Sequence, residues 1–342
     1  MSNIYHEHLE RLRNVETGEG PAVSLYVPLK WTDMPSSKVY AALLKAANGL
    51  LQRGGHPDLD VTSPEWGSWM KQGTVTLAIF HAKGTTIYIP LPLRMQPRVV
   101  VAKSFHIKPI LTAANEYIEG LLLHFNESGA SLYRVNPVGE NLIDSYLPSQ
   151  VLPRSDWPHR LDRLTLRDFL EFLSHEISGN KKLSTKILGI TGASYSELRN
   201  EAFWKRLKLP VFFLDDSFKT AIPQNAAAIM RIRLSHMVKE RHTQSVLEAM
   251  SASSLEQDEM SVRDLGHKII QKEIRHLCVS LDDMQFGELD PGSGLVILNK
   301  NQTDSKDDDV LDDLVELAMD RGVNVSVVPK KYLPLGKTFI AS

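Results

Sequence analysis

GLLLHFNESGASLYRVNPVGENLIDSYLP, residues 120–148, is the segment that predicts the centre of the fold. It holds three runs rich in β-favouring residues, separated by two groups of turn formers at 126–129 and 136–139. Short apolar or alternating runs bounded by Asn, Gly, Ser and Pro are typical of strands joined by tight turns. The segment therefore predicts an antiparallel meander of three strands.

Downstream of this meander, helical and β patterns alternate. A polar loop at 149–163 is followed by an amphipathic helical pattern at 164–179 and by KILGITG (186–192), which predicts a buried strand. A second helical pattern at 194–208 leads to another strand, PVFFLDD (210–216). Alternation of this kind predicts a layered sheet covered by helices.

Upstream of the meander, the sequence predicts a small sheet and one helix. Three β segments make the sheet, and the second folds back on itself as a hairpin around Lys83-Gly84. The β segments are AVSLYVPL (22–29), TVTLAIFHAKGTTIYIPLPL (74–93) and PRVVVAKSFHI (97–107), and the helix is SKVYAALLKAANGLLQRGG (37–55). A further helical stretch begins at Lys108.

The last third of the sequence predicts another αβ unit. Two helical patterns come first, at 225–250 and at 261–276. GLVILNK (294–300), the helical pattern at 310–322 and VNVSVVP (323–329) follow them. A strand, a helix and a strand at this spacing predict a βαβ unit with a right-handed crossover.

Together these patterns place the chain in the α/β class, with mixed α+β character, and predict three layered αβ domains. We expect residues 1–106 to form an N-terminal domain, residues 107–220 a middle domain and residues 221–342 a C-terminal αβα domain. The length of 342 residues fits this division, because single hydrophobic cores stop growing at about 250–300 residues.

Composition and charge narrow the class of protein. The hydrophobic fraction of 42% and the charged fraction of 23% are those of an ordinary globular chain. The formal net charge of -2 argues against coating of nucleic acid through overall charge, although local basic patches can still bind phosphates. The single cysteine, the polar start MSNIYHEHLERLRN and the lack of a long apolar run predict a cytoplasmic protein outside the membrane.

Four segments, in this order, resemble one family: the bacterial relatives of the archaeal and eukaryotic class-1 peptide release factors and of Pelota. AVSLYVPL resembles the family's first strand, and VVVAKSFHIKPIL (99–111) resembles the end of its first domain. GLLLHFNESGASLYRV (120–135) resembles the opening of its middle domain. The stretch 295–329 resembles the closing half of its third domain, which in the family is folded like the RNA-binding ribosomal protein L7Ae.

The sequence departs from this family at both functional motifs. Release factors carry Gly-Gly-Gln in a middle-domain loop, where the glutamine helps to place the attacking water, but the corresponding loop here, 150–163, has no Gly-Gly-Gln. The codon-reading motif Asn-Ile-Lys-Ser is also missing, and the nearest stretch is DMPSSK (33–38). The resemblance therefore implies a factor that can enter a ribosomal A site without release chemistry, as in family members associated with ribosome rescue or with protection of idle ribosomes.

The loop 150–163 is the first candidate for RNA binding. Basic side chains beside an aromatic ring can pair with phosphates while the ring stacks on an unstacked base. Asp156 and Asp162 provide the alternative, since they could pair with the arginines in an ordinary solvated loop. The candidate residues are Arg154, Trp157, His159, Arg160 and Arg163.

The helix at 225–250 is the second candidate, because it is richer in positive charge than the rest of the chain. Such a stripe could follow an RNA backbone, and a solvated helix face is the alternative. The residues are Arg231, Arg233, Lys239 and Arg241, accompanied by His236 and His242. Lys330, Lys331 and Lys337 near the C-terminus have the same two interpretations.

No constellation in the sequence predicts a catalytic site, a metal site or a cofactor. The acidic run at 304–313 lacks the glycine and the final glutamate of an EF-hand loop, and aspartates at the start of a helix stabilise its positive end. Gly192-Ala193-Ser194 lacks the second glycine of a nucleophile elbow. Cys278 lies between Leu277 and Val279, a setting typical of a buried structural thiol.

Three functions stay open at this point. The leading hypothesis is a non-catalytic translation factor that binds the ribosome and its rRNA near the A site in hibernation or rescue, with a translational GTPase as a candidate partner. The second is a peptidyl-tRNA hydrolase or nuclease that uses His159 as acid or base. The third is a protein-interaction module without a ribosomal role. None of the three implies a small-molecule substrate or a membrane.

Overall fold

A computed structural model describes residues 4–15, 20–29, 35–61, 64–71, 74–126, 129–136, 140–146, 171–173, 175–176, 187–192, 204, 210–214, 223–251, 260–300 and 307–342. The chain divides into two compact units. Unit 1 comprises residues 117–238, and unit 2 comprises residues 2–116 together with 239–342. The three domains predicted from the sequence, with boundaries at 106 and 220, do not coincide with these two units, and that division stays a prediction.

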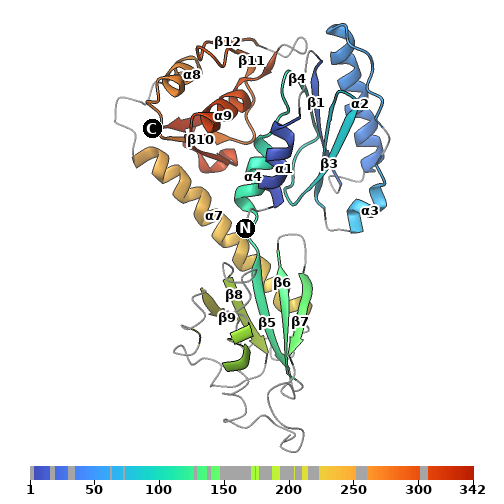
Figure 1. The fold of residues 1–342 in the computed structure, drawn as a ribbon, viewed down its shortest axis with the longest axis vertical. Coiled ribbons are helices and arrows are strands. Elements are labelled where there is room, and N and C mark those ends of the chain that lie inside the picture. Colours follow the sequence, from blue (N-terminus) through green and yellow to red (C-terminus); the bar gives the residue numbers. More distant parts are fainter. Residues whose placement is uncertain are drawn as a thin grey trace, which may run out of the picture. The chain divides into compact units, whose positions relative to one another are not determined.

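The N-terminal part of unit 2 is built on a four-stranded antiparallel sheet in the order β3-β2-β1-β4 (Figure 1). The hairpin around Lys83-Gly84 is confirmed: both residues have positive φ, 47° and 73°, as in the two-residue turns that match the twist of the strands. The strands are β1 (Ala22–Pro28), β2 (Thr76–Ala82), β3 (Thr85–Leu91) and β4 (Arg98–Ala102).

Helices cover this sheet. Val23, Leu25 and Val27 alternate along β1 and pack against the apolar stripe of α2 (Ser36–Arg53), which matches the helix predicted at 37–55. All seven residues of β1 are buried, so its other face is covered too. Helix α4 (Lys108–Glu116) lies beside α1 (Ile4–Arg13). The sequence patterns did not indicate α1 or the short α3 (Trp66–Lys71).

The C-terminal part of unit 2 contains two three-stranded sheets, in the orders β14-β10-β15 and β12-β11-β13. Helix α4 packs against β14, which joins the N-terminal and C-terminal parts into one unit. The elements are α8 (Val262–Ile270), β10 (His276–Ser280), β11 (Phe286–Leu289), β12 (Val296–Leu298), β13 (Asp308–Asp309), α9 (Val310–Asp320), β14 (Asn324–Val328), η7 (Lys330–Tyr332) and β15 (Phe339–Ala341).

Two predictions for this region were wrong. The strand at 294–300 does not pair with the closing strand across the helix, because the parallel partner of β14 is β10. Ile297 in β12 is 56% exposed, whereas Leu277 and Val279 in β10 are at most 1% exposed, so the more apolar run takes the buried position. The second helix ends at Ile270 and not at His276, because Lys272 turns the chain with a φ of 60°.

Unit 1 is built on a five-stranded sheet in the order β7-β6-β5-β8-β9. The predicted antiparallel meander is confirmed, and β8 and β9 extend it in parallel. The strands are β5 (Gly120–Asn126), β6 (Gly129–Val135), β7 (Glu140–Tyr146), β8 (Ile187–Gly192) and β9 (Val211–Phe213). The helical patterns at 164–179 and 194–208 lie mostly outside the described residues.

Helix α7 (Pro223–Ser251) matches the predicted long helix and runs through both units. In unit 1, its residues Met230 and Leu234 pack with Leu122. A Cβ at Gly120 would lie 2.1 Å from the Met230 Cε, so a glycine at the start of β5 allows this close approach. In unit 2, Val246 and Ala249 of the same helix pack with Cys278, whose buried position is confirmed.

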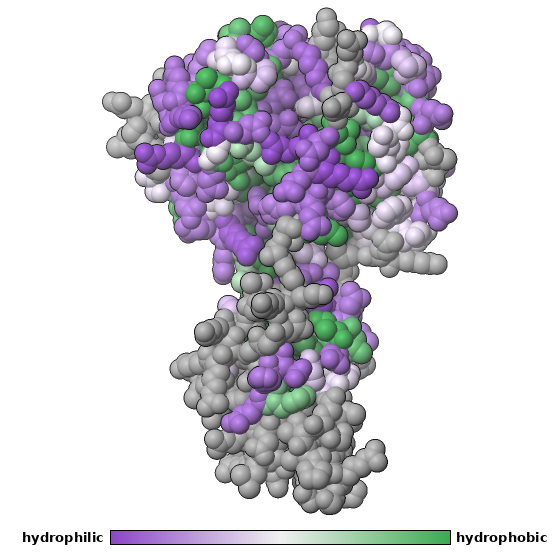
Figure 2. Space-filling view, viewed as in Figure 1, coloured by the Kyte–Doolittle hydropathy of each residue, from purple (hydrophilic) through white to green (hydrophobic). Residues whose placement is uncertain are grey.

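The surface of unit 2 is largely hydrophilic on the face shown in Figure 2. Within the part of the chain that the structure describes, no helix combines the length and the apolar character needed to cross a membrane.

Candidate functional site

The basic residues of α7 differ in how far their charge is available. Arg231 forms an ion pair with Glu140 of β7, and both side chains are partly buried. Arg233 is exposed, with its guanidinium 5.9 Å from the centre of the Phe212 ring. Two residues along a helix are separated by about 200°, so Arg231 and Arg233 lie on different faces. The charge of Arg231 is already neutralised, whereas that of Arg233 is open to solvent.

Farther along α7, Lys239 and Arg241 are exposed. Arg241 donates a hydrogen bond of 3.4 Å to the carbonyl oxygen of Asn115. His242 is buried, with its Nε2 2.9 Å from Glu116 Oε1 and its ring 5.0 Å from the ring of Tyr332. His242 therefore holds the helix in unit 2, and an RNA-binding role for its neighbours stays a prediction.

The loop candidates Arg154, Trp157, His159, Arg160 and Arg163 lie outside the described residues. Of the C-terminal basic group, Lys330 pairs with Asp283 at 2.6 Å, and Lys331 lies 5.2 Å from the centre of the Tyr332 ring. The binding roles of both groups stay predictions.

The structure also shows an ionic network in unit 2 that the sequence did not indicate. It joins the segment before and at the start of α4 to the start of α9. Asp312 of α9 accepts hydrogen bonds from the backbone nitrogens of Ile107, at 2.9 Å, and Lys108, at 2.7 Å. A carboxylate at this position satisfies free N–H groups at the start of α4 and complements the positive end of the helix dipole.

Lys108 supplies the positive charge of this network. Its Nζ lies 2.5 Å from Asp309 Oδ2 and donates a hydrogen bond of 2.8 Å to the carbonyl oxygen of Asp283. Asp309 also caps α9, since its Oδ1 accepts from the backbone nitrogen of Leu311 at 3.3 Å. One aspartate of the acidic run thus both starts the helix and pairs with a buried lysine.

His106 completes the network without a charge of its own. Burial, together with the nearby positive charges of Lys108 and Arg98, lowers the pKa of His106 well below its usual value. Its Nδ1 lies 3.4 Å from Asp312 Oδ1, and its Nε2 lies 3.3 Å from an Arg98 guanidinium nitrogen. The imidazole is therefore a neutral packing group between two charged elements.

This network is unsuited to catalysis, because His106, Lys108, Asp309 and Asp312 are all at most 1% exposed and no substrate could reach them. Among the described residues, no group of three or more His, Cys, Asp or Glu side chains is arranged to hold a metal ion. The arrangement instead joins sequence segments that are about 200 residues apart. The one feature of the sequence that could have indicated this network is Lys108, a lysine within an apolar stretch and far in sequence from any acidic residue.

Comparison with known proteins gives structural similarity at low identity. No protein-family model matches the chain, and no curated protein sequence matches it. The archaeal translation termination factor aRF1 is 14% identical, with a TM-score of 0.23, over 98% of this chain and 93% of that chain. An archaeal Pelota, from a ribosome-bound Pelota and ABCE1 structure, is 11% identical, with a TM-score of 0.39, over 96% and 88%.

Dom34 of S. cerevisiae, a translation termination-like factor, is 11% identical, with a TM-score of 0.34, over 72% of this chain and 68% of that chain. These matches to release-factor-like proteins span nearly the whole length of the chain, which itself has a mixed α/β fold. All three TM-scores are below 0.5, so we assign no residue a role from these structures.

Proposed function

We propose that this protein is a non-catalytic translation factor that binds the ribosome near the A site, in hibernation or in rescue. The main support is the order of the four segments that resemble the release-factor and Pelota family. Each contributes one or more strands, and two of them also a helix: β1, β4 with α4, β5 with β6, and β12, β13 and β14 with α9. The three-domain layout, the L7Ae-like third domain and a translational GTPase partner belong to the same proposal.

The charge of the protein is compatible with this function. The net charge of -2 requires binding to rRNA to depend on local groups. Arg233 and Lys239 on α7 are exposed, and neither forms an ion pair with a described residue. The loop 150–163 adds three arginines in the position that the family uses for chemistry on peptidyl-tRNA.

Co-sedimentation with purified ribosomes tests the proposal. We expect saturable binding to vacant or translating ribosomes that weakens as salt rises, because phosphate contacts release counterions. Alanine at Arg154, Arg160 and Arg163 together should weaken binding strongly. A matched control removes three exposed arginines of unit 2, Arg263, Arg275 and Arg321. An equal loss of binding in both triple variants would refute the assignment of RNA binding to the loop. No binding by the wild type would refute the proposed function.

A peptide-release assay separates this function from that of a hydrolase. Without Gly-Gly-Gln, the wild-type protein should release no peptide from peptidyl-tRNA on stalled ribosomes. Release that is lost in a His159→Ala variant would establish the enzymatic alternative instead.

A further inference from the structure

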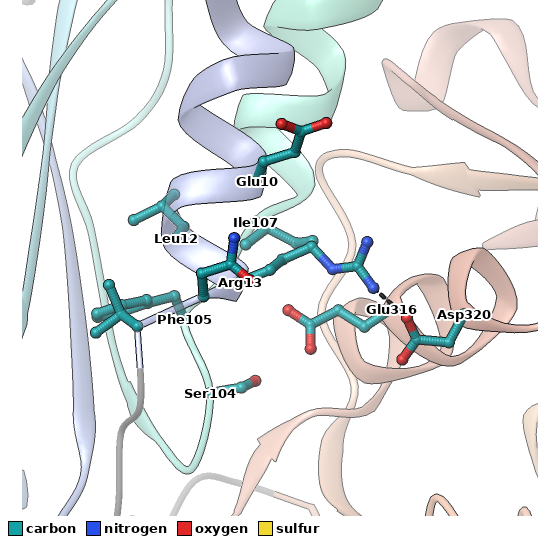
Figure 3. A pocket seen from close by; sticks show the side chains of 10 residues that line it. Glu10, Leu12, Arg13, Ser104, Phe105, Ile107, Glu316 and Asp320 are labelled. Atoms are coloured by element: carbon teal, nitrogen blue, oxygen red, sulfur yellow. Dashed lines mark hydrogen bonds and ion pairs between the residues drawn. The ribbon is translucent and has the colours of Figure 1, made fainter.

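A pocket of about 460 Å³ opens in unit 2 where three segments of the chain meet (Figure 3). The end of α1, the segment before α4, and α9 each contribute side chains. They include Glu10, Arg13, Ser104, Phe105, Glu316 and Asp320. The volume is in the range of about 300–1,000 Å³ that is usual for small-molecule sites.

Negative charge exceeds positive charge in this pocket. Among its described lining residues, Arg13 is the only basic side chain, and it forms an ion pair with Asp320. Glu316 points into the space between Arg13 and Ser104 in Figure 3, and it forms no hydrogen bond or ion pair with a described residue. Glu10 adds a further carboxylate at α1. Arg13 therefore leaves the Glu316 carboxylate without a direct partner.

More carboxylates lie directly behind the pocket wall. The Ser104 hydroxyl is 3.4 Å from Asp308 Oδ2 and 3.4 Å from Asp313 Oδ1. Burial, reinforced by the negative charge of Asp308, raises the pKa of Glu316 to about 8, and burial raises the pKa of Asp308 to about 7. Lys108, the buried lysine of this region, already forms an ion pair with Asp309. A positive guest would stabilise the ionised form of these carboxyl groups, which burial disfavours.

The rest of the lining indicates an organic guest. Leu12, Phe105 and Ile107 belong to the apolar packing behind the pocket, and each of them is at most 4% exposed. The described acidic residues do not have the arrangement that holds a metal ion. A cationic group at the end of an aliphatic chain would suit such a pocket, since the slender chain can enter it while the charged end pairs with a carboxylate.

We propose that this pocket binds the end of an aliphatic chain that carries an ammonium or guanidinium group, with Glu316 as its ion-pair partner. The guest is either a free amine or the side chain of a lysine or arginine on a partner protein. The site lies within unit 2 and does not depend on ribosome binding, so it can be tested without ribosomes.

Isothermal titration of the full chain with 1,4-diaminobutane, and with a short peptide that contains a single arginine, tests the proposal. We expect Glu316→Gln to weaken binding about tenfold or more, because the guest loses its charged partner. The control Glu273→Gln removes the same charge from an exposed residue of unit 2 and should bind as the wild type does. Because burial already favours the neutral form of Glu316, glutamine at this position should not unfold the protein.

The pH dependence gives a second readout. Burial and the negative charges of Asp308 and Asp320 raise the pKa of Glu316, and the positive charge of Arg13 lowers it. The other polar groups around the pocket are Glu10, Ser104 and Asp313. Binding of a cation must displace the proton of Glu316, so affinity should rise between pH 6.5 and 7.5 by up to about tenfold per pH unit. The ammonium group stays charged in this window, because its pKa is about 10.

The outcomes separate the sources of the guest. Tighter binding of diaminobutane supports a free amine, and tighter binding of the peptide supports a partner's side chain. Equal binding to Glu316→Gln and wild type, or no binding of either probe at millimolar concentration, would overturn the proposal. Displacement of the amine by Mg²⁺, with the same sensitivity to Glu316→Gln, would overturn it in favour of a metal site.

Discussion

Lys108 shows how one residue can join distant parts of a chain. A lysine with no exposed surface is tolerated only when its charge is paired and its hydrogen bonds are made. Here Asp309 supplies the charge, and the carbonyl oxygen of Asp283 accepts a hydrogen bond. The lysine is thus fixed by two segments that follow it by about 175 to 200 residues.

Replacement of this lysine should therefore be costly. We expect Lys108→Met to lower the free energy of unfolding by about 3–5 kcal/mol, because Asp309 would be left as a buried charge without its partner. Urea denaturation measures the change. Lys38→Met, at an exposed position on α2, should change the same quantity by less than about 0.5 kcal/mol. Similar losses in both variants would show that the network contributes little.

The raised pKa values of Asp308 and Glu316 predict an unusual dependence of stability on pH. Their folded-state pKa values of about 7 and about 8 lie above those of free carboxyl groups. At pH values between the unfolded-state pKa and the folded-state pKa of these groups, the folded protein holds protons that the unfolded protein has released. The free energy of unfolding therefore falls as pH rises. Chemical denaturation at pH 6 to 9 should show this fall, and Glu316→Gln should make it shallower. A slope that is unchanged in the variant would contradict the assignment.

At the scale of elements, helix α8 and the turn before β12 approach one another through two glycines. A Cβ at Gly266 would lie 2.2 Å from the carbonyl oxygen of Gly294, which is backbone and cannot swing aside. Gly294 itself has a φ of 75°, which side-chain-bearing residues rarely adopt. The position of the β11–β12 hairpin on α8 thus depends on having glycine, which has no side chain, at both positions.

A pair of glycine-to-alanine changes tests this dependence. Gly266→Ala should lower the free energy of unfolding by about 1–3 kcal/mol, because overpacking outweighs the better helix propensity of alanine. Gly49→Ala on α2, where the nearest atom is 3.9 Å away on the flexible side chain of Arg53, should raise it by about 0.5–1 kcal/mol. Both follow from urea denaturation, and stabilisation by Gly266→Ala would show that the two segments can move apart.

The same scale explains which elements the sequence could predict. The meander and the hairpin at Lys83-Gly84 rest on local patterns of turn formers and alternating residues, and both are confirmed. The partner of β14 depends on which of two apolar runs is buried, and that choice is made by packing with the rest of unit 2. The local pattern at 294–300 could not show that β10 would take the place beside β14.

At the scale of the whole molecule, the sites divide in the same way. The basic residues of α7 are visible in the sequence because they are close together on one helix. The network of Lys108 with Asp309 and the pocket around Glu316 assemble residues that are far apart in the sequence, so no spacing within the sequence indicated them. The sequence also could not show that Arg231 is already paired with Glu140.

That pairing leads to a prediction about ribosome binding by the full protein. If α7 contacts rRNA, only its unpaired charges should add to the salt dependence, since a neutralised arginine releases no counterion. Alanine at Arg233 and Lys239 together should reduce the slope of log K against log salt by up to about two, one for each phosphate contact. Co-sedimentation at several salt concentrations measures the slope. The control variant, Arg231→Ala with Glu140→Ala, removes an internal ion pair without changing net charge, so the slope should stay as in the wild type. Equal slopes in wild type and in the Arg233 and Lys239 variant would show that α7 faces away from the RNA, and the loop at 150–163 would then have to supply the contacts.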